Sequence, residues 1–501
     1  MSIKASKWGL TNIVEPVRLQ RGWIKKDSKW FNQANVGEST LRRFGESKEI
    51  GEDCFRSICD ALGVNWKLVT SDLRDAPHVP VFYGRKEELT QLSQWLVKER
   101  SQLVVLRGMG GIGKTSLAVK LVERVWEEFE CIIWRSLSKA PLLQELLAEL
   151  SEYLSDRKEH EDYVSRLIEY LRRKRCLIVL DDLEEIMWSK KLGGNFREEY
   201  QDYGELLIRV AQESHQSCLL LLSRENPSVI EQLGKKKEIC KLEGLPNQDA
   251  RQILNEHGIS CTAKELEELI HRYKGNPYAL YKISPYIQEL CNEDISCFLK
   301  MTSVMIPEPM LDILYKELNR LSDVEEALIY WIAILGNSAS IEQIRNVMLP
   351  FYSGNQSLNG LMSLKKRRSL VNDYWQENMV IFSLPPVIRK YIIKEFVKII
   401  TEEILAVSQS QVVEDFEMFR QHAIITFANE SFTQYQERLI VDKINERLSK
   451  KFKSISKVQA ELIKIANLLQ ESSLLKRYAY ENTLSLISHL EKKKNKNSNM
   501  Y

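Results

Sequence analysis

The sequence predicts an α/β protein whose parallel sheet is preceded by a small helical domain and followed by further helical domains. Two observations predict the sheet. Short apolar segments alternate with amphipathic helices between about residues 81 and 240, which is typical of parallel strands joined by helical crossovers. A glycine-rich run, Gly108–Thr115, connects one apolar segment to a helix. A third observation, helical periodicity from residue 396 onward, predicts an all-helical C-terminal region.

The first 75 residues are predicted to form short helices joined by tight turns. Ser28–Phe44 resembles a helix-turn-helix, with Ala34 where the two helices touch, Val36 in the turn and Ser39–Phe44 as the second helix. Arg42 and Arg43 would then contact the DNA backbone or bases. The segment holds thirteen Lys/Arg and ten Asp/Glu, which is a small basic footprint for a DNA reader. DNA binding and protein binding therefore both stay open for this domain.

Residues 76–80 break the helical pattern and are predicted to be a linker. Four strands are predicted in the segment that follows: Leu103–Leu106, Cys131–Trp134, Cys176–Leu180 and Cys218–Leu222. Each is a short apolar run, as expected of strands that are buried on both faces of a parallel sheet.

The run Gly108–Thr115 satisfies the spacing G-x-x-x-x-G-K-[ST] of a phosphate-binding loop, or P-loop. Its glycines let backbone N–H groups curl around phosphate oxygens, and the following helix N-terminus favours an anion. Lys114 is expected to reach the β- and γ-phosphates and Thr115 to bind Mg²⁺. The residues expected to surround the phosphates are Gly108, Gly110, Gly111, Ile112, Gly113, Lys114, Thr115 and Ser116. The sequence therefore predicts binding of a nucleoside triphosphate or diphosphate.

Two carboxylates follow another predicted strand. Asp181 is expected to hold Mg²⁺ through water, and Asp182 to orient or deprotonate the attacking water. Neighbouring strand residues point to opposite faces, so both can contribute only if the strand ends at Asp181. A third strand is followed by Ser223 and Arg224, and the permanent charge of Arg224 could contact a γ-phosphate. The plainer alternative, strands that simply end in polar residues, stays open.

The second half of the chain is predicted to be mainly helical. Leu266, Leu269, Ile270 and Tyr273 have helical spacing, and Val380–Leu384 is a predicted strand within a segment whose composition suits a winged helix. Farther along, one apolar stripe is expected to pack into a core: Ile444, Leu448, Phe452, Ile455, Leu462, Ile465 and Leu469. The lysine-rich segment 492–497 is predicted to be solvated and disordered.

These motifs together resemble the NB-ARC class of signalling ATPases, which is known from plant disease-resistance proteins and animal apoptotic-protease activators, and the bacterial branch most of all. The resemblance covers roughly residues 78–395. It includes Val81–Leu89 at the domain entrance, Phe129–Leu137 as the second strand, the pair Asp181 and Asp182, Ser223–Arg224, and Gly275–Leu280. It implies a STAND-class switch protein that binds ATP and ADP with Mg²⁺.

The resemblance also implies roles for single residues. The backbone around Phe82 would meet adenine, and Arg85 would face the nucleotide. Arg224 would contact the γ-phosphate, and Pro277 would pack on the bound nucleotide. One position departs from the family pattern: Pro385 stands where a histidine usually touches the β-phosphate of ADP. Proline has no side-chain donor and no backbone N–H, so the usual ADP lock is in doubt.

Domain boundaries follow from these patterns. They are 1–75 for a helix-turn-helix-like domain, 81–240 for a P-loop nucleotide-binding domain, 241–304 for a helical domain, 305–395 for a winged-helix domain, 396–490 for a helical region and 491–501 for a basic tail. The leading hypothesis is a signalling switch with slow Mg²⁺-dependent ATP hydrolysis. It would self-assemble on activation and bind a protein partner through its N- or C-terminal region. The rival hypothesis is a transcription regulator that reads DNA with its first domain.

Composition sets the remaining expectations. The longest apolar runs fall short of the ~18 residues that a membrane span requires, and the first residues lack the apolar core of a signal peptide. The nine cysteines form no C-x-x-C pair, and the seven histidines have no metal-ligand spacing with them. We therefore expect a cytoplasmic protein without membrane contact, and no metal other than the Mg²⁺ of a bound nucleotide.

Overall fold

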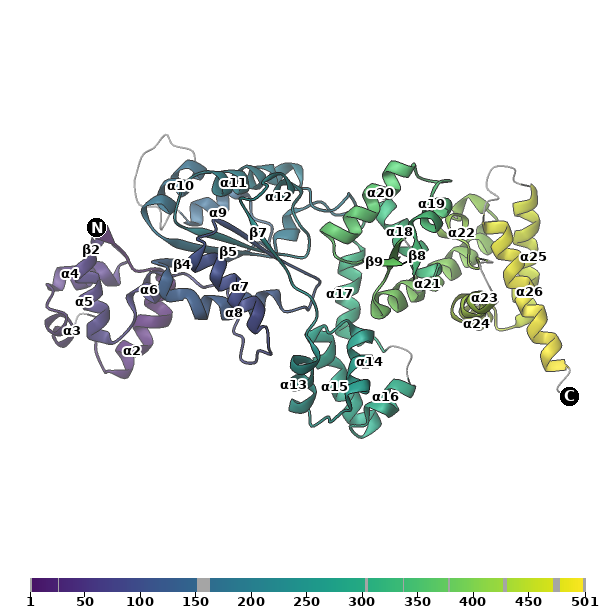
Figure 1. The fold of residues 1–501 in the computed structure, drawn as a ribbon, viewed down its shortest axis with the longest axis horizontal. Coiled ribbons are helices and arrows are strands. Elements are labelled where there is room, and N and C mark those ends of the chain that lie inside the picture. Colours follow the sequence, from purple (N-terminus) through teal and green to yellow (C-terminus); the bar gives the residue numbers. More distant parts are fainter. Residues whose placement is uncertain are drawn as a thin grey trace. The chain divides into compact units, whose positions relative to one another are not determined.

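The computed structural model describes residues 2–25, 27–150, 163–301, 305–336, 338–376, 379–426, 430–471 and 478–498 (Figure 1). The chain divides into two compact units, and each is described by itself. The first consists of the described residues within 1–189, 193–256 and 276–278. The second consists of those within 190–192, 257–275 and 279–501.

The first unit begins with a small helical domain. Its elements are β1 (Ser2–Ile3), α1 (Lys7–Gly9), α2 (Glu15–Gln20), α3 (Ser28–Gln33), α4 (Glu38–Gly45), β2 (Ile50–Gly51), α5 (Glu52–Leu62) and α6 (Trp66–Thr70). Trp30, Phe44 and Phe55 form its aromatic centre, with an edge-to-face contact between Trp30 and Phe44. Ala34 is buried just after α3, as the sequence predicts. The short antiparallel pair β1 and β2 was not predicted.

A five-stranded parallel sheet forms the centre of the first unit, which confirms the predicted fold class. The strands are β3 (Leu103–Arg107), β4 (Cys131–Ser136), β5 (Cys176–Asp181), β6 (Cys218–Ser223) and β7 (Glu238–Lys241), in the order β4-β5-β6-β3-β7. The four predicted strands each run one or two residues farther than expected. The strand β7 was not predicted, because its polar ends hide a short apolar centre.

Helices cover both faces of this sheet (Figure 1). One face packs against α7 (Lys86–Ser93) and α8 (Lys114–Val125). The other packs against α9 (Leu143–Leu150), α10 (Tyr163–Arg173), α11 (Gln201–Gln212) and α12 (Ser228–Gln232). The helix α13 (Asn247–Glu256) follows the sheet. Because all five strands are parallel, their carboxyl ends meet at one edge, where ligands bind in sheets of this kind.

The second unit contains a small antiparallel sheet among helices, as in a winged helix. Its strands are β8 (Ala339–Ser340), β9 (Asn372–Gln376) and β10 (Met379–Ser383), in the order β8-β10-β9. Only β10 was predicted. The helices of this unit include α14 (Ala263–Tyr273), α15 (Pro277–Cys291) from Ala279 onward, α16 (Ile295–Met301), α17 (Glu308–Leu318), α18 (Asp323–Ile334), α19 (Ile341–Met348), α20 (Gly354–Met362) and α21 (Pro386–Ser410).

The chain continues through α22 (Met418–Gln421), α23 (Glu430–Gln436), α24 (Asp442–Phe452), α25 (Ile455–Glu471) and α26 (Ala479–Ser498). The predicted core packing of the apolar stripe is confirmed for Ile444, Leu448, Leu462, Ile465 and Leu469, which are buried. The stripe is not continuous, because Lys453 adopts a left-handed conformation (φ 57°) and separates α24 from α25. Ile455 is consequently 47% exposed, and Val458 takes a buried position in its place.

The predicted disorder of segment 492–497 is also wrong, since α26 runs through it to Ser498. The first three lysines of this segment have partners on neighbouring elements: Lys492 lies 3.4 Å from a Glu437 carboxylate, Lys493 pairs with Asp442, and Lys494 donates to Gln459. These contacts offset the repulsion between like charges that the sequence pattern alone suggests.

Candidate nucleotide-binding site

The glycine-rich loop lies between β3 and α8, at the carboxyl edge of the sheet. Gly111 and Gly113 have positive φ angles of 76° and 97°, which residues with a side chain rarely adopt. A Cβ atom at Gly108 would lie 2.9 Å from the carbonyl oxygen of Leu242. The loop therefore needs glycine at these positions, and its backbone leads directly into the first turn of α8, whose N–H groups favour an anion.

Lys114 is the first residue of α8, and its side chain folds back over the loop. Its Nζ donates to the carbonyl oxygen of Gly108 at 2.8 Å and to that of Met109 at 3.3 Å. The ammonium group thus lies over the backbone that would surround phosphates. Phosphate oxygens would be stronger acceptors than these carbonyls because they are charged.

Thr115 and Asp181 form the second part of the site. The Thr115 hydroxyl donates to Asp181 Oδ2 at 2.9 Å. Asp181 is the last residue of β5 and only 6% exposed. Burial, and next the neighbouring charge of Asp182, raise the pKa of the Asp181 carboxyl to about 6, while the hydrogen bond from Thr115 opposes the shift. A hydroxyl beside a buried carboxylate is the donor set that Mg²⁺ takes at P-loops, so these residues fit the predicted ion.

Asp182 follows the end of the strand in a left-handed conformation (φ 59°), and its N–H donates to Asp181 Oδ1 at 2.9 Å. The strand β5 ends at Asp181, so the carboxylates of Asp181 and Asp182 can both lie at the carboxyl edge of the sheet. The Asp182 carboxylate accepts a hydrogen bond of 2.8 Å from the hydroxyl of Ser136, at the end of β4. The sequence analysis did not single out Ser136, although its place at a strand end was the available signal.

Arg224 follows β6 and pairs with an acidic residue that the sequence analysis did not consider. Its Nε lies 2.9 Å from Glu184 Oε1, and its backbone N–H donates to Glu184 Oε2 at 3.1 Å. Glu184 is buried, so Arg224 provides its compensating charge. Contact between Arg224 and a γ-phosphate stays a prediction.

The entrance segment reaches the loop through Arg85. The Arg85 guanidinium is 4% exposed, donates to the carbonyl oxygen of Ile112 at 3.1 Å and pairs with Glu88 at 2.8 Å. Phe82 is half-buried and packs against the sheet face that also holds Ile112. Arg85 therefore supports the backbone of the phosphate-binding loop. Its contact with a nucleotide stays a prediction.

The segment 276–278 also contacts the loop. Asn276 Nδ2 donates to the carbonyl oxygen of Gly110 at 3.0 Å, and the Tyr278 N–H donates to that of Gly111 at 3.4 Å. The ring of Pro277 lies 3.9 Å from where a Cβ of Gly113 would stand. Pro277 is thus beside the loop as expected, while Asn276 is a contact that sequence reasoning missed.

Pro385 belongs to the second unit, where it immediately precedes α21. Four residues farther on, Arg389 lies over the ring of Tyr435 at 4.6 Å and donates to the carbonyl oxygen of Ala333 at 3.4 Å. These contacts occupy Arg389 within its own unit. The effect of Pro385 on ADP stays a prediction.

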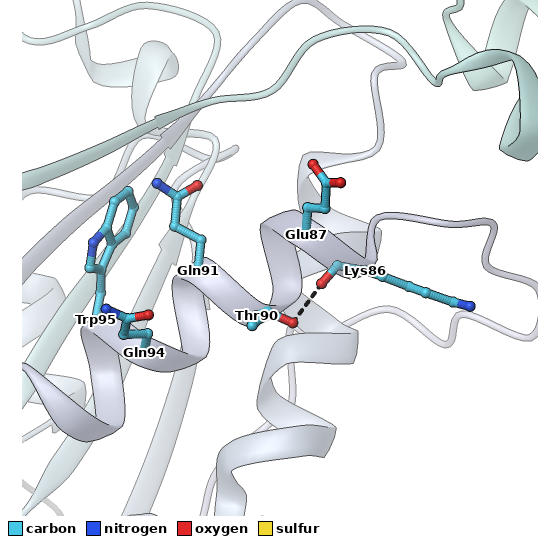
Figure 2. A pocket seen from close by; sticks show the side chains of 6 residues that line it. All are labelled: Lys86, Glu87, Thr90, Gln91, Gln94 and Trp95. Atoms are coloured by element: carbon cyan, nitrogen blue, oxygen red, sulfur yellow. Dashed lines mark hydrogen bonds between the residues drawn. The ribbon is translucent and has the colours of Figure 1, made fainter.

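A pocket of about 570 Å³ lies along α7 and the π-helical turn that follows it, Gln94–Lys98 (Figure 2). It is lined by Lys86, Glu87, Thr90, Gln91, Gln94 and Trp95, none of which is a predicted site residue. The Thr90 hydroxyl is already satisfied by the carbonyl oxygen of Lys86 at 2.7 Å. This pocket is separate from the loop and its lining has no basic cluster for phosphates.

Two absences in the described part of the chain bear on metals and membranes. Within it, no three His, Cys, Asp or Glu side chains gather closely enough to hold a metal ion by themselves. Its helices also include none with the length and apolar character needed to cross a bilayer.

Comparisons with known proteins agree with this site. Residues 85–264 match the family model of the NB-ARC domain. An uncharacterized WD repeat-containing protein of Nostoc sp. is 31% identical over 465 residues, which is 80% of this chain and 36% of that protein. A disease resistance protein of Arabidopsis thaliana is 25% identical over 191 residues, which is 35% of this chain and 21% of that protein. This chain therefore spans about a third or less of the length of these relatives.

Among solved structures, a Walker-type ATPase of Pyrococcus abyssi has a TM-score of 0.43 and 15% identity, covering 62% of this chain and 96% of that one. A STAND protein with a tetratricopeptide repeat sensor from Pyrococcus horikoshii has a TM-score of 0.32 and 17% identity, covering 83% and 59%. The range that matches the NB-ARC family model, residues 85–264, contains the phosphate-binding loop, Asp181, Asp182 and Arg224. Residues 85–264 of this chain match the NB-ARC domain family and contain its phosphate-binding loop.

Proposed function

We propose that this chain is an ATP/ADP-dependent switch of the STAND class that acts in signal transduction. The observation that carries the proposal is the contact of Asn276 and Tyr278 with the carbonyls of Gly110 and Gly111. These residues stand at the start of α15, whose later residues belong to the second unit. A change in the loop on nucleotide exchange would thus act directly on the helix that leads out of the nucleotide-binding domain.

The residues of the site divide the work of nucleotide binding and hydrolysis. Lys114 and the loop N–H groups would bind the phosphates, and the Thr115 hydroxyl and, through water, the Asp181 carboxylate would hold Mg²⁺. Mg²⁺, when bound, neutralises charge on the phosphates. Asp182 orients the attacking water and accepts its proton. The site would thus position the attacking water and stabilise the charge on the phosphates, which is compatible with slow hydrolysis.

Switching follows from the different contacts that ADP and ATP make. Each nucleotide stabilises the packing of domains to which it binds more tightly, and it can shift the equilibrium only by that difference. We propose that the ADP form is compact, that exchange for ATP opens it for self-assembly, and that slow hydrolysis resets it. A protein partner would bind through the N- or C-terminal region.

A second candidate function, nucleotide-regulated DNA binding, rests on α3 and α4. Ala34 is buried at the turn between them, and Arg42 and Arg43 on α4 are exposed. Arg43 donates to the carbonyl oxygen of Glu49 at 2.7 Å, and Arg42 lies 4.0 Å from Glu46. These exposed contacts are weak and would yield to phosphates. The Glu46 carboxylate beside Arg42, together with the small basic excess of the first 75 residues, makes this the weaker candidate.

The test compares the full chain loaded with ADP and with a non-hydrolysable ATP analogue, each with Mg²⁺. Light scattering reports mass and small-angle scattering reports compactness. A compact monomer with ADP and a larger or more open species with the analogue would support the switch. Identical mass and dimensions in both states would contradict it. A mobility-shift assay of the same two samples at stated salt would decide for the DNA-binding alternative if the shift depended on the nucleotide.

A further inference from the structure

The helical N-terminal domain is joined to the nucleotide-binding sheet by a single β-bridge beside its edge strand β4. After α6, the backbone N–H of Asp72 donates to the carbonyl oxygen of Ile132 at 2.8 Å. The N–H of Trp134 in turn donates to the carbonyl oxygen of Asp72 at 2.9 Å. Asp72 thereby pairs in parallel with Ile133 of β4, which forms one edge of the five-stranded sheet. The segment that connects the two domains is therefore held against the sheet by backbone hydrogen bonds.

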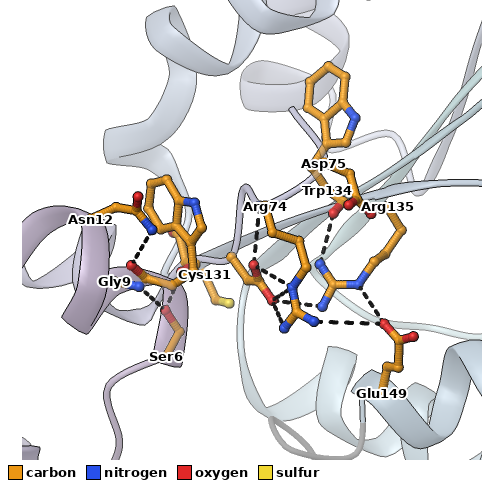
Figure 3. Close-up of polar contacts among 12 residues, drawn as sticks. Ser6, Gly9, Asn12, Arg74, Asp75, Cys131, Trp134, Arg135 and Glu149 are labelled. Carbon is orange, nitrogen blue, oxygen red and sulfur yellow. Dashed lines mark hydrogen bonds and ion pairs between the residues drawn. The ribbon is translucent and has the colours of Figure 1, made fainter. Parts of the chain in front are cut away.

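Charged side chains fix the same junction (Figure 3). The Asp72 carboxylate is fully buried and pairs with Arg135 of β4 at 2.7 Å and with Arg74 at 2.5 Å. Both guanidinium groups also reach toward Glu149 of α9, at 3.5 Å from Arg135 and 3.9 Å from Arg74. A buried carboxylate between two arginines holds one geometry, because displacing either partner leaves a charge uncompensated.

The residues that follow carry the junction to the nucleotide site. Asp75 Oδ2 accepts a hydrogen bond of 3.1 Å from the backbone N–H of Ser136, the last residue of β4. The hydroxyl of Ser136 lies 2.8 Å from Asp182 Oδ2. The N–H of Ser138 donates to the same hydroxyl oxygen at 3.2 Å, and the Ser138 hydroxyl lies 2.9 Å from it. The charged Asp182 carboxylate is the stronger acceptor for the Ser136 hydroxyl proton, and the Ser138 hydroxyl can then donate to Ser136 Oγ. A continuous series of hydrogen bonds therefore runs from Asp75 through Ser136 to Asp182.

We propose that Ser136 is a positioning residue for the Asp182 carboxylate, and that Asp75 of the N-terminal junction holds Ser136 in place. This inference rests on the proposed function, since it assigns Asp182 to hydrolysis. The hydroxyl of Ser136 fixes one carboxylate oxygen and leaves the other for the attacking water. A carboxylate that can rotate orients water less well, because catalytic groups must be held within about 0.5 Å of their working geometry.

The N-terminal domain then has a route to the hydrolysis rate. A ligand or partner that pulls the segment 72–75 from the edge of β4 would release the Ser136 N–H, and with it the position of Asp182. Segment 72–75 and Asp182 both belong to the first unit, so this effect on hydrolysis requires no contact with the second unit.

Steady-state ATP hydrolysis by full-length variants, with Kd for ATP and Mg²⁺ measured beside it, tests the proposal. Ser136→Ala is expected to lower kcat on the order of tenfold, the worth of one hydrogen bond to a charged group, with Kd within about twofold. Ser136→Thr keeps the hydroxyl and is expected to restore turnover. Asp75→Ala is expected to lower kcat by a smaller factor. Asp75→Asn keeps an oxygen acceptor and serves as its matched control.

The turnover of the variants decides the roles of Ser136 and of Asp75 separately. Wild-type turnover in Ser136→Ala, or equal loss in Ser136→Ala and Ser136→Thr, overturns the role of Ser136. Wild-type turnover in Asp75→Ala overturns the role of the junction. If the unmodified chain binds ATP and Mg²⁺ without hydrolysing ATP, the hydrolytic step of the proposed function fails, and this inference fails with it. Normal hydrolysis by the unmodified chain with unaffected variants overturns the inference alone.

Discussion

The hydroxyl of Thr115 donates to the buried carboxylate of Asp181 at 2.9 Å, which joins the start of α8 to the end of β5. The strand β6 lies between β3 and β5 in the sheet, so the two residues come from elements that are not neighbours. The loop sets the position of Thr115, and the strand end sets that of Asp181. Their proximity at one edge is what makes a Mg²⁺ site from residues 66 positions apart.

The raised pKa of Asp181 predicts a stability that depends on pH. Its folded-state pKa of about 6 exceeds the ordinary value of ~3.9, so the folded chain binds the proton more tightly than the unfolded chain. Stability from this residue is therefore gained as the pH falls through about 6, and lost as the pH rises. Without nucleotide or Mg²⁺, Asp181→Asn should raise the free energy of unfolding by roughly 2–3 kcal/mol at pH 7 and by about half as much at pH 5.

Denaturant unfolding of both proteins at the two pH values checks this prediction. Asp202→Asn, which alters an exposed carboxylate on α11, is the control and should change little at either pH. A gain for Asp181→Asn that is equal at pH 5 and pH 7 would show that the Asp181 carboxyl does not titrate in this range.

Asp182→Asn should reduce ATP turnover far more than it reduces ATP affinity. An orienting or basic carboxylate acts mainly in the transition state, so its loss appears in kcat. We expect kcat to fall by about 100-fold or more, with the Kd for ATP within about threefold. Single-turnover hydrolysis and equilibrium titration of the same preparation measure the two quantities. Hydrolysis at the wild-type rate would remove Asp182 from the mechanism.

Pro385→His should slow ADP release if position 385 faces the nucleotide. A restored hydrogen bond to the β-phosphate would stabilise the closed ADP state by roughly 1–3 kcal/mol, and about 1.4 kcal/mol changes the open-to-closed ratio tenfold. Pro385→Ala is the necessary control, because removing proline also frees the backbone. Stopped-flow release of ADP compares all three proteins. Equal rates for the histidine and alanine variants would mean that this position does not reach the phosphate.

The sequence was sufficient for the elements whose signals are local. The loop, the apolar strands and the helix periodicity of α14 each follow from neighbouring residues. The change from apolar to acidic residues placed the end of β5 at Leu180, one residue before its observed end at Asp181. The strand β7 could not be predicted, because its end residues Glu238 and Lys241 are charged and only two apolar residues lie between them. The lysines of α26 pair with Glu437 and Asp442, which lie far away in the sequence, so their partners could not be read from the local pattern.

The same reason explains which parts of the site were missed. Ser136 and Asn276 lie within quoted motifs that gave them no role, and Glu184 lies in none; each acts through a partner far away in the sequence. Asn276, for example, contacts a carbonyl 166 residues before it. Only the folded chain brings such pairs together. Sequence reasoning placed Arg224 near the site but could not find Glu184, the buried acid that neutralises it.

The most direct test of the central claim is the binding of ADP and ATP to full-length Lys114→Ala, measured by isothermal titration with Mg²⁺. Lys120→Ala is the matched control, because Lys120 lies on the same helix α8 but pairs with Glu123 at 2.7 Å on the surface. If the loop binds phosphates, the wild-type and Lys120→Ala proteins bind both nucleotides, whereas Lys114→Ala loses binding and keeps its thermal unfolding midpoint. Unchanged affinity in a folded Lys114→Ala protein would contradict the account.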